Sequence, residues 1–176
     1  LTAKAMPNAL SVIACAPRGG LLHAPDVYMQ KIAIGPGYPE GVVDLDMSPA
    51  ENVMALADAK GVEISQLNVC VLDRIRHEGI IDDLRSVGAR ISLISDGDIA
   101  GVINTTNPKT QIDMYLGSGG APEGVLAAAA LKCVGGQMQG RLIFRNDDER
   151  RRATKIGLSD FDKKYDLHAL CSQDTI

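Results

Sequence analysis

Residues 117–124 read GSGGAPEG. This glycine-rich run has the features of an anion-binding site and also contains one carboxylate. Glycines let a backbone approach a ligand closely, and the free N–H groups at a helix start attract an anion. Glu123 adds a carboxylate in the first turn of a helix predicted to begin at Pro122, either as a metal ligand or as a charge that interacts with the helix dipole. A carboxylate beside a phosphate needs a positive charge between them, which a divalent metal ion usually supplies. The segment therefore indicates metal-assisted chemistry on a phosphorylated small molecule.

Two further strand-like runs are each followed by charged residues. The first is followed by DRIRH, which contains Arg74 and Arg76, and the second by DGD, which contains Asp96 and Asp98. Guanidinium groups suit bidentate binding of a phosphate, and aspartates suit a metal ion or the hydroxyls of a sugar. The alternative for the arginines is a solvated helix start, and for the aspartates a turn with a helix cap.

Polar residues at the ends of neighbouring parallel strands gather at one edge of a sheet, where ligands bind in open α/β folds. We therefore expect all three segments to line one site. Nucleotide binding is disfavoured, because the glycine run has neither the Lys-Ser/Thr end of a P-loop nor the spacing G-x-G-x-x-G. By spacing alone, His77 is interpreted as a helix-face residue and Tyr28 as a strand-packing residue. Ser118 has no recognisable base in the sequence, so a serine hydrolase is disfavoured.

The elements that must position these residues alternate between strand and helix. Ser48, Pro49 and Glu51 form a capping box with a proline in the first turn, which predicts a helix start. The alternation predicts an α/β fold with a largely parallel sheet and right-handed crossovers. Strands are predicted at residues 9–16, 67–72, 90–95, 111–116 and 140–144, an extended segment at 21–35, and helices at 49–60, 80–87, 99–103, 122–134 and from 146 onward.

The composition is that of an ordinary globular chain. Its 176 residues are 45% hydrophobic and 23% charged, and no apolar run reaches the roughly 18 residues of a membrane span. A net charge of −4 and few aromatic residues argue against a nucleic-acid partner. The cysteines form no C-x-x-C pair and predict buried free thiols in a reducing cytosol. These are Cys15, Cys70, Cys133 and Cys171.

Four segments carry a family resemblance: residues 22–29 (LHAPDVYM), 74–77 (RIRH), 94–98 (ISDGD) and 119–124 (GGAPEG). In their order and intervals they closely resemble class II fructose-1,6-bisphosphatases, and the later GRL of residues 140–142 agrees as well. The resemblance covers nearly the whole chain, and four ordered motifs are more specific than any one of them. It implies a layered α/β fold of the lithium-sensitive sugar-phosphatase type. It also implies hydrolysis of a 1-phosphate that depends on Mg²⁺ or Mn²⁺.

The resemblance assigns roles to individual residues. Glu123 is implied to be a metal ligand, and the backbone at Gly120 is implied to contact the substrate. The residues implied to bind the sugar bisphosphate are Tyr28, Arg74, Arg76, Asp96 and Asp98. For Tyr28 this replaces the packing role. The family often has a proline where Ile75 stands, a departure that leaves both flanking positions basic.

The resemblance also implies that the chain is the central part of a larger enzyme, incomplete at both ends. We expect residues 1–62 to end an N-terminal phosphatase layer and residues 63–176 to form a truncated C-terminal α/β domain. The other metal carboxylates, and the threonine that positions the attacking water, would precede a position like Leu1. The isolated chain is therefore expected to be inactive.

The predicted activity of the whole enzyme is metal-dependent hydrolysis of fructose 1,6-bisphosphate to fructose 6-phosphate and phosphate. We expect a cytoplasmic homo-oligomer of gluconeogenesis or the reductive pentose phosphate cycle, with no nucleic-acid or membrane partner. One alternative is a catalytically incomplete fragment that binds sugar phosphates. The other is a close relative that acts on sedoheptulose 1,7-bisphosphate or an inositol phosphate.

Overall fold

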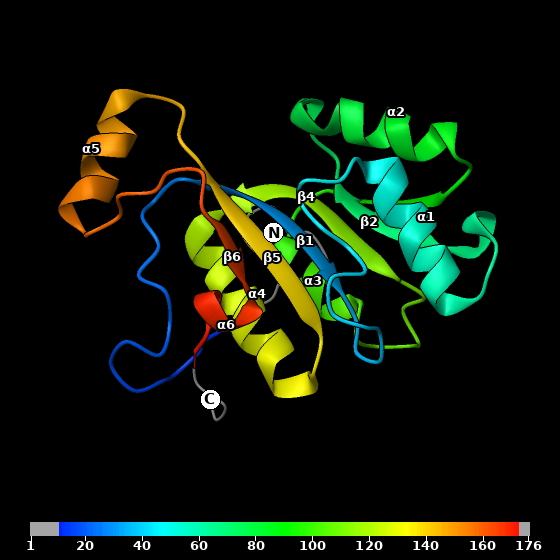
Figure 1. The fold of residues 1–176 in the computed structure, drawn as a ribbon, viewed down its shortest axis with the longest axis horizontal. Coiled ribbons are helices and arrows are strands. Elements are labelled where there is room, and N and C mark those ends of the chain that lie inside the picture. The colour runs from blue at the N-terminus through cyan, green and yellow to red at the C-terminus, as the bar shows by residue number, and fades with distance from the viewer. Residues whose placement is uncertain (1–10, 173–176) are drawn as a thin grey trace.

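A mixed sheet of six strands forms the centre of the protein, of which the computed structural model describes residues 11–172 (Figure 1). The strands are β1 (Tyr28–Ile34), β2 (Asn68–Leu72), β3 (Arg90–Ile94), β4 (Met114–Gly120), β5 (Gln137–Ile143) and β6 (Lys164–Asp166). They lie in the order β3-β2-β4-β1-β5-β6. The predicted α/β fold is confirmed.

The prediction of a largely parallel sheet holds only for β2, β3 and β4, because the other side of the sheet is antiparallel. β2 pairs parallel with both β3 and β4, as the alternation of strands and helices predicts. β1 lies between β4 and β5 and runs antiparallel to both, and β6 is antiparallel to β5. The sequence does not predict this insertion, because a strand pattern does not say which distant strand becomes the neighbour. As a result Tyr28, at the amino end of β1, lies opposite Gly120 and Ile143 at the carboxyl ends of β4 and β5.

Helices cover both faces of the sheet, so the fold has three layers (Figure 1). On one face lie α1 (Pro49–Lys60) and α2 (Glu78–Ser86), and on the other α3 (Asp98–Asn104), α4 (Ala121–Val134) and α6 (Leu167–Leu170). α5 (Asp147–Lys155) follows β5, and two short 3-10 turns are η2 (Ile64–Gln66) and η3 (Ile75–His77). The helices on each face bury the apolar side chains that alternate along the strands.

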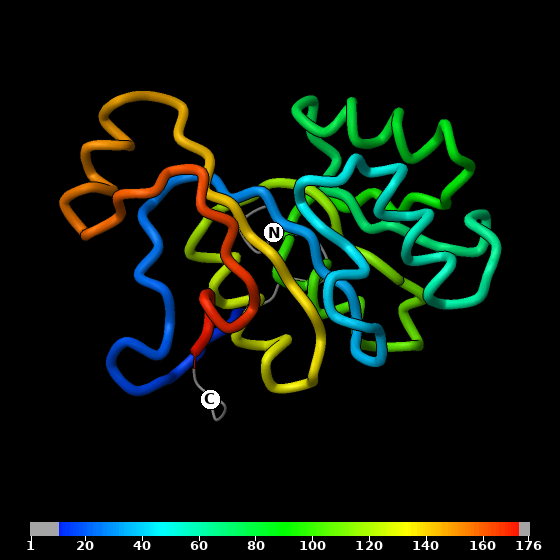
Figure 2. The backbone as a smooth tube through the Cα atoms, viewed as in Figure 1, coloured from blue at the N-terminus to red at the C-terminus, as the bar shows by residue number. Residues whose placement is uncertain are grey.

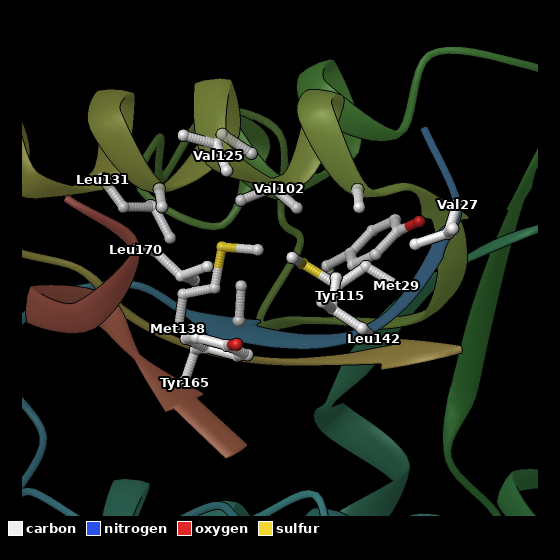
Figure 3. Packing of buried hydrophobic residues seen from close by; sticks show 14 of the residues in the cluster. Val27, Met29, Val102, Tyr115, Val125, Leu131, Met138, Leu142, Tyr165 and Leu170 are labelled. Atoms are coloured by element: carbon white, nitrogen blue, oxygen red, sulfur yellow. The ribbon is translucent and has the colours of Figure 1, made fainter. Parts of the chain in front are cut away.

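Two apolar cores fill the space between the sheet and its helices. The core beneath α1 and α2 includes Ile32 and Leu116 from the strands, with Leu56 and Leu84 from the helices. Figure 3 shows the other core, where Met29, Tyr115 and Met138 of the sheet meet Val125 and Leu131 of α4. Burial of each such aliphatic side chain contributes about 1.5–3 kcal/mol.

The predicted helix boundaries hold where cap residues mark them. Ser48 Oγ accepts the N–H of Glu51 at 3.2 Å, and Glu51 Oε2 accepts the N–H of Ser48 at 2.7 Å, so the capping box of α1 is confirmed. Gly61 ends α1 in the left-handed conformation with φ of 70°. The charge run at residues 146–152 begins α5, with the Asn146 side chain as its cap.

Two predicted boundaries are wrong. Residues 9 and 10 of the strand predicted at 9–16 lie outside the described residues, and residues 11–16 form no strand, with Ile13 87% exposed. An apolar run becomes a strand only where a sheet edge can pair with it, and this run meets none within the described residues. The strand predicted at 111–116 ends too early, because β4 continues through Gly120 and α4 begins at the next residue.

Cys15, Cys70 and Cys133 are free thiols, as predicted, but only two of the four cysteines are buried. Cys70 and Cys171 are buried, and burial raises the pKa of the Cys70 thiol to about 12. Cys15 and Cys133 are exposed, so the prediction that they are buried is wrong. Cys15 lies in the run that forms no strand, and Cys133 lies in the last turn of α4.

The start and the end of the described chain lie side by side (Figure 2). Leu22 N–H donates to the Leu170 carbonyl at 3.0 Å, and Ser172 N–H donates to the Gly20 carbonyl at 3.0 Å. The division into domains at residues 62 and 63 stays a prediction, although β1 shares one sheet with the later strands. Among residues 11–172, no helix is long and apolar enough to cross a membrane.

Candidate functional site

One edge of the sheet collects the predicted site residues. It is formed by the carboxyl ends of β2, β3, β4 and β5 and by the amino end of β1. The chain turns here from β2 into η3 and α2, from β3 into α3, and from β4 into α4 (Figure 1). The residues that lie at this edge are Tyr28, Arg74, Arg76, Asp96, Asp98, Gly120 and Glu123.

Arg74 and Asp96 join the ends of β2 and β3. Arg74 Nη2 lies 2.8 Å from Asp96 Oδ1, and Arg74 Nη1 donates to the Asp73 carbonyl at 2.7 Å. The two side chains are 37% and 42% exposed, so the ion pair contributes little to stability. A guanidinium held in this way is oriented and still open to an anionic ligand.

Arg76 is fixed against β4. Its Nε donates to Ser118 Oγ at 3.0 Å and its Nη2 to the Ser118 carbonyl at 2.7 Å. The guanidinium carbon lies 5.0 Å from the centre of the Tyr28 ring, and that of Arg145 lies at the same distance from the ring. Arg145, which is missing from the predicted site, follows β5 and is held by the buried carboxylate of Glu149 at 2.5 Å. The Tyr28 ring therefore makes cation–π contacts with both Arg76 and Arg145.

His77 is buried against β4 and is not the helix-face residue that its spacing suggests. Its Nδ1 lies 2.8 Å from the Leu72 carbonyl, which can only accept, so Nδ1 carries the proton. Nε2 then accepts the N–H of Ser118 at 2.9 Å and lies 3.0 Å from Ser118 Oγ.

Ser118 therefore has a histidine within reach, contrary to the sequence-based expectation. Two contacts make this pair a structural one. The single lone pair of His77 Nε2 accepts the amide of Ser118, and Ser118 Oγ accepts a hydrogen bond from Arg76. The pair ties the segment that carries Arg76 to β4, and a serine-hydrolase mechanism remains disfavoured.

Lowering the pH from about 7.5 to about 5.5 is expected to lower the free energy of unfolding through His77. Burial lowers the pKa of His77, so the unfolded chain takes up a proton at a higher pH than the folded chain. The stabilisation is complete above the ordinary histidine pKa and is lost as the pH falls through the lowered one. Urea denaturation of the full-length protein at the two pH values measures the loss. The loss between the two pH values is expected to be smaller in a His77→Gln variant. An equal loss in the variant and in the unaltered protein would contradict the role of His77.

Lys31 and Asp98 form a buried ion pair behind the exposed residues. Lys31 lies in the middle of β1, Asp98 begins α3, and the side chains are 1% and 6% exposed. The ammonium of Lys31 donates to Oδ2 of Asp98. Burial lowers the pKa of Lys31, an effect that the nearby Asp98 carboxylate opposes.

Two glycines of the GSGGAPEG run make room for this ion pair. A Cβ at Gly119 would lie 2.2 Å from Asp98 Oδ2 and 3.2 Å from Lys31 Nζ. A Cβ at Gly124 would lie 3.0 Å from Lys31 Cε and 2.6 Å from Met29 Sδ. These two glycines are therefore explained by contacts within the protein, and not only by the close approach of a ligand.

A Gly119→Ala substitution is expected to lower the free energy of unfolding by about 1–3 kcal/mol, because the added methyl group overpacks a buried ion pair. Gly79→Ala is the matched control, since Gly79 lies in α2 and no atom lies within 4 Å of its added Cβ. The control is expected to be neutral or to stabilise by up to about 1 kcal/mol. Urea denaturation measures both, and equal stability of the two variants would refute the crowding at Gly119.

Glu123 lies exposed in the first turn of α4. Its Oε2 accepts the N–H of Gly120 at 3.2 Å. The backbone of Gly120, which the resemblance implies to contact the substrate, is therefore hydrogen-bonded to the Glu123 carboxylate in this structure. Among residues 11–172, no three His, Cys, Asp or Glu side chains are grouped so that they could hold a metal ion. The described residues offer one candidate ligand and do not by themselves make a metal centre.

Comparison with known proteins identifies the family. A family model described as bacterial fructose-1,6-bisphosphatase, glpX-encoded, matches residues 1–176. The chain belongs to this family. The D-fructose 1,6-bisphosphatase class 2/sedoheptulose 1,7-bisphosphatase of Synechococcus sp. (strain JA-3-3Ab) is 40% identical over 184 residues, which cover 98% of this chain and 53% of that protein. The protein of the same name from Prochlorococcus marinus (strain NATL1A) is 36% identical over 189 residues, covering 100% of this chain and 56% of that protein.

The chain spans about half the length of these curated fructose-1,6-bisphosphatase relatives. Two residues are missing from the predicted site, Lys31 behind the sheet edge and Arg145 after β5, and the sequence does not predict the buried contacts of His77. Arg145 carries the clearest missed signal, because it directly follows a predicted strand, as the motif residues do. Lys31 carries a weaker one, a lysine inside a run of apolar strand residues.

Proposed function

We propose that the full-length protein carrying this chain hydrolyses the 1-phosphate of fructose 1,6-bisphosphate, and that this chain supplies much of the substrate site. The observation that carries the proposal is the convergence of Arg74 and Arg76 with Asp96 and Asp98 at one sheet edge. Cations for a phosphate and carboxylates for hydroxyls are the chemistry that a sugar phosphate requires. Family membership supports the same class of substrate.

Each residue has a role in this proposal. Arg74 and Arg76 bind the distal phosphate, which competes with Asp96 for the open guanidinium of Arg74. Arg76 needs no rearrangement, since Ser118 already holds it. Asp96 and Asp98 accept hydrogen bonds from the sugar hydroxyls. The ring of Tyr28 holds the cations in place beside the ligand.

The proposal includes a divalent metal ion, Mn²⁺ or Mg²⁺, with Glu123 as one ligand and the backbone at Gly120 near the reacting phosphate. Such an ion polarises a phosphoryl oxygen and lowers the pKa of a bound water. Within residues 11–172, Glu123 is not grouped with other side chains that could ligate a metal ion. The further ligands therefore have to come from outside the described residues. We accordingly propose that the isolated chain binds sugar phosphate without turnover.

Phosphate release from fructose 1,6-bisphosphate by the full-length protein with Mn²⁺ tests the proposal. An Arg76→Gln substitution is expected to raise KM by about 10-fold, the cost of one charge-assisted hydrogen bond. Arg85→Gln is the matched control, because Arg85 is an exposed arginine of α2 that forms, within residues 11–172, a single ion pair, with Asp82 at 3.6 Å. Absence of phosphate release, or equal KM values for the two variants, would contradict the proposal.

Sedoheptulose 1,7-bisphosphate is a second candidate substrate, favoured by one observation: the names of the curated relatives join both activities. The two sugars share the reacting phosphate and much of the sugar, so the same arginines and aspartates serve either one. Measuring kcat/KM for both bisphosphates, and for an inositol phosphate as a third, decides between the substrates.

We also propose that the protein is a cytoplasmic homo-oligomer. Support for the cytoplasm comes from the thiols of Cys15, Cys70 and Cys133, which are free. The oligomeric state stays a prediction from the sequence. Light scattering of the purified full-length protein tests it, and a monomeric mass at micromolar concentration would contradict it.

A further inference from the structure

Lys31 is a fully buried charged residue that the proposed reaction does not use. It lies between Met29 and Ala33 on the face of β1 that carries the core shown in Figure 3. Its partners in the two neighbouring strands are Gly117 and Gly140. A lysine in such a position requires a partner, because an unpaired buried charge is strongly unfavourable.

The partner of Lys31 is a residue of the proposed sugar site. Lys31 donates a hydrogen bond to Asp98 Oδ2, and within residues 11–172 neither side chain makes any other hydrogen bond. Oδ1 of Asp98 therefore has no protein partner there. Among the described residues, Tyr115 Oη is the only fully buried side-chain N or O atom without a hydrogen bond. Asp98 Oδ1 has no hydrogen bond either, so it is not fully buried. Although Asp98 is only 5% exposed, Oδ1 therefore keeps some contact with the surface, where a ligand can reach it.

We propose that Lys31 is a positioning residue for sugar-phosphate binding. By holding Oδ2, it fixes the Asp98 carboxylate so that Oδ1 is presented to a hydroxyl of the sugar. This inference rests on the proposed function, in which Asp98 binds the sugar. Lys31 acts through Asp98 and does not touch the ligand, because its own side chain is 1% exposed. A carboxylate that is already oriented loses less freedom when the ligand binds, and this raises affinity.

The glycines at 119 and 124 support this role. They keep side chains out of the space around the ion pair, and they belong to the segment that leads from β4 into α4. The ion pair therefore joins β1, α3 and the start of α4. Without the Lys31 ammonium, no side-chain hydrogen bond within residues 11–172 fixes the orientation of the Asp98 carboxylate.

Calorimetric titration of the full-length protein with fructose 6-phosphate, and separately with inorganic phosphate, tests the inference. Lys31→Met is expected to weaken fructose 6-phosphate binding by about 10-fold, because one oriented hydrogen bond from the sugar is lost. Inorganic phosphate, which binds through the arginines, is expected to bind with unchanged affinity. Tyr115→Phe is the matched control, since it removes a polar atom from the same core and no hydrogen bond. It is expected to bind both ligands as the unaltered protein does.

A double substitution keeps the test decisive where Lys31→Met does not fold. The variant with Lys31→Met and Asp98→Asn has no unpaired buried charge, and it is expected to bind fructose 6-phosphate as weakly as Asp98→Asn alone. The inference is overturned if the double variant binds more weakly than Asp98→Asn, or if Lys31→Met binds fructose 6-phosphate normally. Equal weakening of inorganic phosphate binding by Lys31→Met also overturns it. Absence of fructose 6-phosphate binding by the unaltered protein would overturn the proposed function, and this inference with it.

Discussion

A Glu123→Gln variant of the full-length protein is expected to hydrolyse fructose 1,6-bisphosphate at least about 100-fold more slowly, since changes around bound metals outside the ligand set already cost ~10–100-fold. The amide keeps the size of the side chain and its oxygen can still accept the Gly120 N–H. It lacks the negative charge that a divalent cation prefers. The variant should also need a higher Mn²⁺ concentration for half-maximal activity. Phosphate release across a series of Mn²⁺ concentrations measures both effects.

Glu78→Gln is the control for this substitution. Glu78 is likewise an exposed acidic residue in the first turn of a helix, α2, at the same edge of the sheet. It is expected to change neither the rate nor the Mn²⁺ dependence. If Glu123→Gln and Glu78→Gln behave alike, Glu123 acts only as a helix cap and the proposed metal role is wrong.

A Lys31→Met substitution is expected to lower the free energy of unfolding by about 3–5 kcal/mol, because it leaves Asp98 as a buried charge without a partner. Replacing both residues together, as Lys31→Met with Asp98→Leu, removes both charges and is expected to cost much less. Urea denaturation of the full-length protein measures both variants. The coupling between the two substitutions then reports the cost of the isolated charge.

Lys60→Met provides the comparison at the surface. Lys60 pairs with Asp113 at 2.5 Å, but its side chain is 37% exposed, so the loss is expected to stay below about 1 kcal/mol. A loss of stability at Lys31 no larger than the loss at Lys60 would show that the ion pair of Lys31 and Asp98 is not held away from water.

Local signals made much of the fold predictable. The capping box at Ser48 and Glu51 and the glycine at 61 mark α1, because each satisfies backbone groups that a helix end leaves free. The strand runs at 67–72 and 90–95 correspond to β2 and β3, whose parallel pairing follows from the helix between them. These features depend on neighbours in the sequence and can therefore be read from it.

Features that depend on distant pairing could not be predicted. The place of β1 between β4 and β5 brings Tyr28 opposite Gly120, and no pattern within residues 28–34 encodes that neighbour. The apolar run at 11–16 has the composition of a strand, but it pairs with no sheet edge in the described part of the chain. Tertiary context decides both cases.

The candidate site likewise contains residues that local sequence signals predict and residues that only distant contacts explain. Strand ends predict that Arg74, Asp96 and Glu123 meet at one edge, because parallel strands align their carboxyl ends. The contacts of Lys31 and His77 depend on which side chains β4 and α3 bring to them, and a single lysine or histidine in the sequence does not reveal such partners. Motifs thus indicate the groups that can meet a ligand, and the structure adds the groups that hold them.

A crystal structure of the full-length protein with fructose 6-phosphate bound would show directly where the sugar phosphate lies. We expect the phosphate within hydrogen-bonding distance of Arg74 and Arg76, and the sugar hydroxyls facing Asp96 and Asp98. We also expect Lys31 to keep its contact with Asp98. A ligand bound away from this edge of the sheet, with its phosphate far from both arginines, would contradict the account.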